Sequence, residues 1–203
     1  MLNPGIKYKL EPEYRARMVH VGRHEAGHYV AARVLGFKTG AIEFTMLDLT
    51  GAHRASADIF LACPLHDTPS IGDYLERRIT VLYAGVWAES LQNGELDPEI
   101  AEQSLTSGGG VHDHQKAREL IQLLRNIRFP EAKSEEEINA GLATIYEELW
   151  MRAADIVKAD HEMVEGLGCR VVSLATELGE PVGLSEAQLE SLPAIKKRFG
   201  CAD

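Results

Sequence analysis

Apolar residues recur at helical spacing over most of the chain. The first such stretch, from about Tyr14 to Leu35, predicts one or two helices, and Gly36 is typical of the residue that follows a helix C-terminus. Later stretches with the same spacing predict a helix over 70–91, a helix that ends before Pro130, one or two helices after Ser134 and a last short helix after Ser185. We therefore expect a mainly helical protein.

The pattern changes between Gly40 and Ala62. Two short runs of β-branched and alternating residues, separated by Thr50 and Gly51, predict a small hairpin or sheet. The segment 95–111 contains three consecutive glycines and is expected to be a loop. Together these patterns predict a fold that is mainly α with a small β-sheet (α+β), formed by a single domain over residues 1–203 in which residues 1–10 are an irregular lead-in.

The charge balance is acidic, with 21 lysines and arginines against 31 aspartates and glutamates and a formal net charge of -10. A chain of this charge without a basic patch repels phosphate backbones, so we expect no nucleic-acid partner. The 3 cysteines are far apart and fit neither a disulfide framework nor a cysteine-based zinc site, which favours a reducing compartment. The sequence shows neither a signal peptide nor a membrane span, so the cytoplasm is the expected location.

The run His24-Glu25-Ala26-Gly27-His28 carries the strongest chemical signal. Residues four apart lie on one face of a helix, so the two imidazoles can bind one metal ion. Glu25 lies next to the first histidine, where it can accept a proton from a water on that metal, as in HExxH zinc hydrolases. The alternative interpretation is an amphipathic helix with two surface histidines. Gly27 favours the metal site, because glycine inside a helix costs about 1 kcal/mol relative to alanine and indicates a close packing contact.

On this hypothesis the reaction is peptide hydrolysis. A zinc-bound water has a pKa of about 7, so Glu25 can remove its proton and pass it to the leaving amine after attack on the scissile carbonyl. A catalytic zinc usually has three protein ligands. The extended histidine motif of the metzincins is absent, because Ala31 and Val34 stand where that motif needs glycine and histidine. The expected third ligand is therefore a carboxylate further along the chain.

Two later segments complete a resemblance to a known family. AGVWAESLQNG at 84–94 and TSGGGVHDHQKAR at 106–118 follow HEAGH in order. Together they resemble the peptidase domain of the FtsH-type ATP-dependent zinc metallopeptidases, whose corresponding segments are GGRAAEELxxG and TTGASNDLxxAT. The resemblance implies a zincin-type helical domain with a Zn2+ cofactor. In the family the aspartate of the second segment is the third ligand, which implies a metal site of His24, His28 and Asp113.

The chain departs from the family at several positions. Val86 and Ser90 replace the family's arginine and second glutamate, and His112 and His114 flank Asp113 in place of asparagine and leucine. Either histidine is an alternative third ligand, and Asp113 is alternatively only the N-terminal cap of its helix. The identity of the metal stays open for the same reason.

Glu89 matches the first glutamate of the family segment. A carboxylate on a neighbouring helix can accept the second ring N–H of a zinc-binding histidine, and this is the role expected for Glu89. The alternative is an ordinary solvated glutamate. His20 lies one turn before His24 and is a candidate for the wall of the same cleft.

The segment from Arg54 to Ala62 falls where the family has an edge strand beside the zinc. An extended polypeptide can pair with such a strand by backbone hydrogen bonds, which gives weak sequence specificity. The alternative is an ordinary edge strand on which Asp58 is a guarding charge.

The sequence contains no phosphate-binding loop, so ATP-driven unfolding is not expected of this chain. We expect a zinc metalloendopeptidase that hydrolyses peptides or unfolded polypeptide, with Glu25 as general base. A separate ATPase or adaptor is a candidate partner for substrate delivery. Family members assemble as rings, but that assembly depends also on the ATPase, so homo-oligomerisation stays open. The alternative functions are a noncatalytic zinc-binding module for polypeptide or a partner protein, and a purely structural helical protein.

Overall fold

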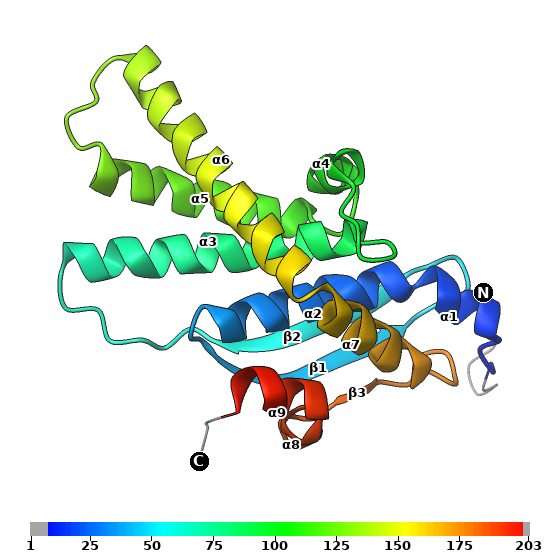
Figure 1. The fold of residues 1–203 in the computed structure, drawn as a ribbon. Helices are drawn as coiled ribbons and strands as arrows, with labels where there is room; N and C mark the ends of the chain where they lie inside the picture. The colour runs from blue at the N-terminus through cyan, green and yellow to red at the C-terminus, as the bar shows by residue number, and fades with distance from the viewer. Residues whose placement is uncertain (1–7, 201–203) are drawn as a thin grey trace.

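The computed structural model describes residues 8–200 (Figure 1). The fold is mainly helical with a small antiparallel sheet, as predicted. Its helices are α1 (Pro12–Arg17), α2 (Val19–Val34), α3 (Thr68–Ser90), α4 (Pro98–Ser107), α5 (Val111–Arg128), α6 (Glu135–Ala159), α7 (His161–Ser173), α8 (Glu186–Ser191) and α9 (Pro193–Phe199). Its strands are β1 (Lys38–Met46), β2 (His53–Phe60) and β3 (Val182–Leu184). Within the described part, every helix is too short or too polar to span a lipid bilayer.

The predicted lead-in at 1–10 lies mostly outside the described residues. Its last residues are tied to the far end of the chain: Lys9 forms an isolated bridge with Glu177, and the Leu10 N–H donates to the Thr176 carbonyl at 2.8 Å. Leu10 is buried in the core.

The three strands form an antiparallel sheet in the order β2-β1-β3. Alternate residues of β1, among them Ile42 and Phe44, are buried because one face of the sheet packs on the core. The predicted turn between β1 and β2 contains Gly51 at φ 114°, a conformation that favours glycine. The prediction of an edge strand in Arg54–Ala62 is confirmed, since β2 pairs with β1 on one side only within the described residues, but the strand ends at Phe60, two residues earlier than predicted.

Helix α2 is the centre of the molecule and lies between the sheet and α3 (Figure 1). Gly27 faces α3 so closely that an added Cβ would lie 2.6 Å from the Ala84 carbonyl oxygen and would also overlap the Ala88 Cβ. The prediction that Gly27 marks a close packing contact is therefore confirmed. Gly168 of α7 has the same function on another side of α2, where its Cβ would lie 2.6 Å from the Arg23 nitrogen. These approaches fix the position of α2, which carries the HEAGH residues.

The start of α3 differs from the prediction. The helix begins at Thr68, and Asp67 is its N-cap: the carboxylate accepts the Ser70 N–H at 2.8 Å, and Ser70 reciprocates from the third helical position. The helices predicted after Ser134 and Ser185 are confirmed as α6 and α8, and each of these serines forms a capping box at the start of its helix.

The segment 95–111 is not only a loop, because it contains α4. Asp97 caps this helix by accepting the backbone N–H groups of Glu99 and Ile100, and Pro98 occupies the first helical position. Ala101 and Ser104 are buried on its inner face. The glycines that dominated the sequence pattern form only the short connection from α4 to α5. Strand β3 was also missed, because three residues are too few to show alternation.

Candidate metal centre

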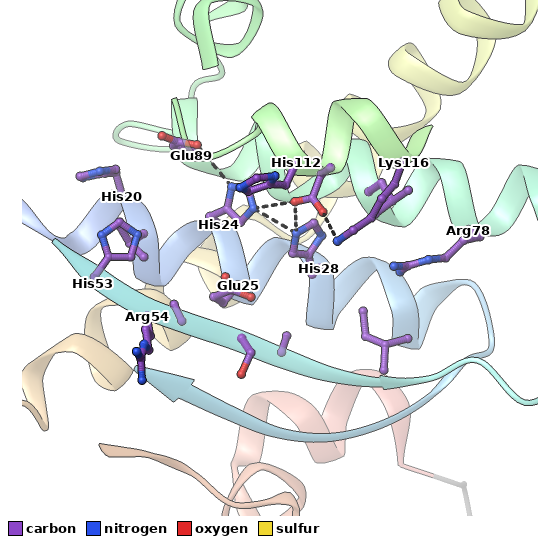
Figure 2. Close-up of a pocket in the computed structure, with 18 residues that line it drawn as sticks. His20, His24, Glu25, His28, His53, Arg54, Arg78, Glu89, His112 and Lys116 are labelled. Carbon is purple, nitrogen blue, oxygen red and sulfur yellow. Dashed lines mark hydrogen bonds and ion pairs between the residues drawn. The ribbon is translucent and has the colours of Figure 1, made fainter. Parts of the chain in front are cut away.

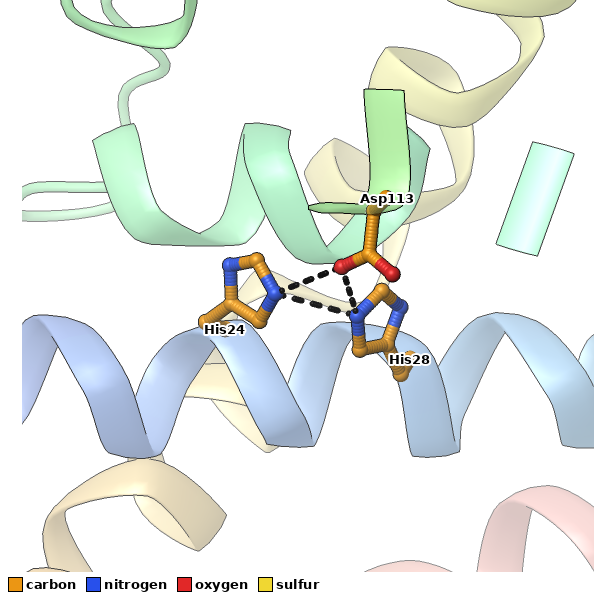
Figure 3. Close-up of side chains that lie close together, drawn as sticks. All are labelled: His24, His28 and Asp113. Atoms are coloured by element: carbon orange, nitrogen blue, oxygen red, sulfur yellow. Dashed lines mark hydrogen bonds and ion pairs between the residues drawn. The ribbon is translucent and has the colours of Figure 1, made fainter. Parts of the chain in front are cut away.

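Three side chains from two helices meet at one point (Figure 3). His24 and His28 project from consecutive turns of α2, and Asp113 comes from the first turn of α5. Asp113 Oδ2 lies 3.0 Å from His24 Nε2 and 2.9 Å from His28 Nε2, and the two ring nitrogens are 3.0 Å apart. The three residues are 7%, 8% and 8% exposed, in chain order. Of the described residues, these form the cluster that could hold a metal ion.

The outer nitrogens of both rings are held by oxygen acceptors. His28 Nδ1 lies 2.8 Å from the Val81 carbonyl oxygen, and His24 Nδ1 lies 3.3 Å from Glu89 Oε2. A carbonyl or carboxylate oxygen can only accept, so each Nδ1 must carry the hydrogen. In the neutral rings each Nε2 therefore presents a lone pair, and both lone pairs point toward Asp113.

This convergence of lone pairs suits a cation. Two imidazole nitrogens and a carboxylate oxygen at about 3 Å repel one another unless a proton or a metal ion lies among them. Burial lowers the pKa of His24, but its hydrogen bonds to Asp113 and Glu89 outweigh that effect and raise the pKa to about 10. Burial raises the pKa of the Asp113 carboxyl, but His28 and His24 hold it well below its usual range. The residues present thus fit a metal ion bound by two nitrogens and one oxygen.

Glu89 occupies the position predicted for it and has a second partner that the sequence did not reveal. Its Oε2 accepts the Ser104 hydroxyl at 2.7 Å, and Ser104 Oγ accepts the Gly110 N–H at 3.1 Å. Burial raises the pKa of the Glu89 carboxyl, but the hydrogen bonds from His24 and Ser104 lower it below its ordinary value. Gly109 leaves room for this contact, since a Cβ there would lie 3.0 Å from Glu89 Oε2. Helix α4 and the following loop therefore fix the carboxylate that orients His24.

The other oxygen of Asp113 faces a lysine. Lys116 Nζ lies 3.5 Å from Asp113 Oδ1, and Lys116 is one turn further along α5. Both carboxylate oxygens of Asp113 thus have cationic or hydrogen-bonding neighbours, which limits the rotation of this side chain.

Asp113, rather than either neighbouring histidine, joins the two histidines of α2. His112 lines the adjacent cleft but is outside the cluster. His114 packs near Tyr83, with ring centroids 6.4 Å apart, and its Nδ1 is buried without a hydrogen-bond partner in the described part of the chain. The alternative that Asp113 only caps α5 is wrong, because the N-cap residue is Gly110.

The cluster forms part of the wall of a cleft of about 530 Å³ between α2, β2, α3 and α5 (Figure 2). Glu25 lines this cleft, is half-buried and forms no side-chain hydrogen bond within residues 8–200. Figure 2 shows His20 and His53 toward one end of the cleft and Arg78 toward the other, with His24 and His28 between them. His20 thus lines the cleft, as the sequence suggested.

Arg78 is a cleft residue that the sequence analysis did not single out. Burial lowers the pKa of its guanidinium group, although the charge of Asp113 acts in the opposite direction. Leu82 and Glu89 line the same cleft, and an added Cβ at Gly85 would lie 2.5 Å from His28 Nε2. These positions share one face of α3 with Arg78 because they follow it at helical spacing. The helical spacing of these residues is visible in the sequence. It identifies Arg78 as a cleft residue only when the face of α3 that packs on α2 is known.

Comparison with known proteins assigns the chain to no family. The chain matches no protein-family model and has no significant match among curated proteins. The likeness to the FtsH-type peptidase domain rests on the sequence segments quoted above and stays a prediction. The geometry itself supports a buried His24-His28-Asp113 cluster that could hold a metal ion in the wall of an open cleft.

Proposed function

We propose that this protein is a zinc-dependent metallopeptidase that hydrolyses peptides or unfolded polypeptide. The observation that carries the proposal is the convergence of His24, His28 and Asp113 beside Glu25 in one cleft. A site with two imidazole nitrogens and one carboxylate oxygen suits zinc and leaves a coordination position for water or substrate. The FtsH-type zincin fold is the architecture that the sequence resemblance suggests for this domain.

Glu25 is the proposed general base. When bound, zinc would act as a Lewis acid that polarises the scissile carbonyl and lowers the pKa of a water molecule. Glu25 is free of competing hydrogen bonds in the described part of the chain, so its carboxylate can accept a proton from the attacking water. The same carboxyl group then donates this proton to the departing amine nitrogen.

The neighbouring residues fix the geometry that this reaction needs. Val81 and Glu89 hold the outer nitrogens of His28 and His24, so neither ring can rotate its Nε2 away from the metal position. Ser104 in turn holds Glu89. The proposed ligands are therefore oriented before any metal binds.

Strand β2 supplies a site for the substrate backbone. Its residues alternate between exposed and half-buried, and Ala55, Ala57 and Ile59 line the cleft beside the cluster. Among residues 8–200 no strand pairs with its outer edge, where an extended polypeptide can form an additional antiparallel or parallel ladder. Such pairing needs an unfolded segment and selects weakly among side chains.

The test is cleavage of an unfolded, fluorescently labelled protein by the zinc-loaded chain. We expect cleavage by the wild type and none by Glu25→Gln, although both should bind one zinc ion per chain by elemental analysis. Glu147→Gln is the matched control, because Glu147 is exposed on α6 and does not line the cleft. Equal cleavage by wild type and Glu25→Gln would overturn the mechanism. Zinc binding without cleavage by the wild type would favour the noncatalytic binding module instead.

A further inference from the structure

One end of the cleft carries a cationic side chain, Arg78, that does not contact the His24-His28-Asp113 cluster. Arg78 lines the cleft, is half-buried and forms neither a hydrogen bond nor an ion pair with any other residue in the range 8–200. The neighbouring Arg77 on the same helix is paired: its guanidinium lies 2.9 Å from the Asp73 carboxylate and donates to the Leu35 carbonyl at 3.2 Å. Two adjacent arginines thus differ in that one is paired and the other faces an open cleft.

None of the carboxylates that line the cleft, Glu25, Glu89 and Asp113, pairs with Arg78 within residues 8–200. Asp113 is in contact with both histidines and with Lys116, and Glu89 is held by His24 and Ser104. Lys116 adds a second positive charge near this end of the cleft (Figure 2). The formal net charge of the chain is -10, so an unpaired cation in this cleft is unusual for so acidic a protein.

A guanidinium group that is partly withdrawn from water gains most from a carboxylate. Arginine presents its N–H donors in a planar fork that matches the two oxygens of a carboxylate, and such charge-assisted pairs are stronger than neutral hydrogen bonds. A polypeptide carries carboxylates at its C-terminus and on aspartate and glutamate side chains. An extended segment beside β2 would pass Arg78, because Arg78 and Ile59 line the same cleft.

We propose that Arg78 is a specificity-determining residue that binds a carboxylate of the polypeptide substrate, either its C-terminal carboxylate or an acidic side chain beside the scissile bond. This inference rests on the proposed function for the identification of the ligand as a polypeptide. It goes beyond that function because pairing with β2 alone would not distinguish charged from neutral substrates. Lys116 supports the same selection through its charge, although its contact with Asp113 gives it a second function.

Peptide binding tests the inference without requiring turnover. The protein is Glu25→Gln supplied with zinc, and the probes are three labelled, unstructured peptides of otherwise identical sequence, measured by fluorescence anisotropy. The first has a free C-terminal carboxylate and no acidic residue, the second has an amidated C-terminus and one glutamate, and the third has an amidated C-terminus and glutamine in that position. The variant Arg78→Gln is compared with Arg118→Gln, a matched loss of charge at an exposed position of α5 outside the cleft.

We expect Arg78→Gln to weaken binding of at least one carboxylate peptide about tenfold while leaving the neutral peptide unchanged. An effect on the first peptide identifies a C-terminal carboxylate as the ligand, and an effect on the second identifies an acidic side chain. Carboxylate peptides that bind no tighter than the neutral one, or equal losses in Arg78→Gln and Arg118→Gln, would overturn the inference.

The experiments distinguish failure of the Arg78 inference from failure of the proposed peptidase function. If the protein cleaves unfolded protein but Arg78 does not distinguish carboxylate from neutral peptides, the carboxylate site is refuted and the peptidase function is supported. Arg78-dependent binding without cleavage by the wild type would refute the peptidase function and support the carboxylate site.

Discussion

The carboxylate of Glu89 orients one of the proposed metal ligands, and its replacement by glutamine tests this role directly. Glutamine has the same shape and can still offer a carbonyl oxygen to His24 Nδ1. The substitution removes the negative charge and leaves one acceptor oxygen where the carboxylate has two. His28 is held by the Val81 backbone and is untouched by the change. We therefore expect Glu89→Gln to weaken zinc binding without abolishing it.

The geometry sets the size of this effect. Loss of an outer hydrogen-bond partner of a metal-binding histidine typically lowers metal affinity about 10- to 100-fold. The distance of 3.3 Å from His24 Nδ1 to Glu89 Oε2 is at the long end for a hydrogen bond, which favours the lower limit. A tenfold loss corresponds to about 1.4 kcal/mol of binding free energy.

Ser104 provides an internal control for this reasoning. Its hydroxyl donates to Glu89 at 2.7 Å, so Ser104→Ala should weaken zinc binding by about threefold through Glu89. In a Glu89→Ala background the same substitution should have a smaller effect, because the contact with Glu89 is gone and only the acceptor of the Gly110 N–H is lost. Ser107→Ala is the matched control, since the Ser107 hydroxyl donates to the Gln103 carbonyl within its own helix.

Competition with a chromogenic zinc chelator gives the dissociation constants, and circular dichroism establishes that each variant is folded. An unchanged constant for Glu89→Gln would refute the claim that this carboxylate orients His24. Additive losses in the double variant would refute the path from Ser104 through Glu89.

Two further predictions concern packing and protonation. Gly27→Ala should lower the free energy of unfolding by about 1–3 kcal/mol, because its Cβ would overlap Ala84 and Ala88 of α3, whereas Gly166→Ala has open space and should be neutral or stabilising; urea denaturation measures both, and equal midpoints would contradict the packing argument. The pKa of His24 is raised to about 10 in the metal-free protein, so this ring is protonated at neutral pH and zinc binding there should release about one proton, with affinity rising as the pH increases toward 10. Calorimetry in buffers of different ionisation enthalpy measures that release, and its absence would contradict the raised pKa.

The sequence predicts the helices and the histidine pair well because both depend on local spacing. HEAGH places its histidines on one face of a helix whatever the rest of the fold is, and helical spacing of apolar residues predicts the helix before Pro130, which is α5, for the same reason. Asp113 was reached only through the resemblance to a family. Its closeness to His24 depends on the packing of α5 against α3, which no local pattern encodes.

The missed features depend on signals that are weak or nonlocal. Helix α4 has an Asp97-Pro98 start signal, but the glycines after it suggested a loop. Ser104 lies on α4, so it could not be identified as the partner of Glu89 without predicting that helix. Arg78 resembles any solvated helix cation until the face of α3 that meets α2 is known. These residues line or support the cleft, and their positions depend on helix packing as well as on helix formation.

The central claim is that His24, His28 and Asp113 bind one zinc ion. Anomalous diffraction at the zinc absorption edge from crystals of the zinc-loaded protein tests it most directly. We expect one strong peak bounded by Nε2 of His24, Nε2 of His28 and a carboxylate oxygen of Asp113. A cluster without a peak, or a zinc ion bound by His112 or His114 in place of Asp113, would contradict the claim.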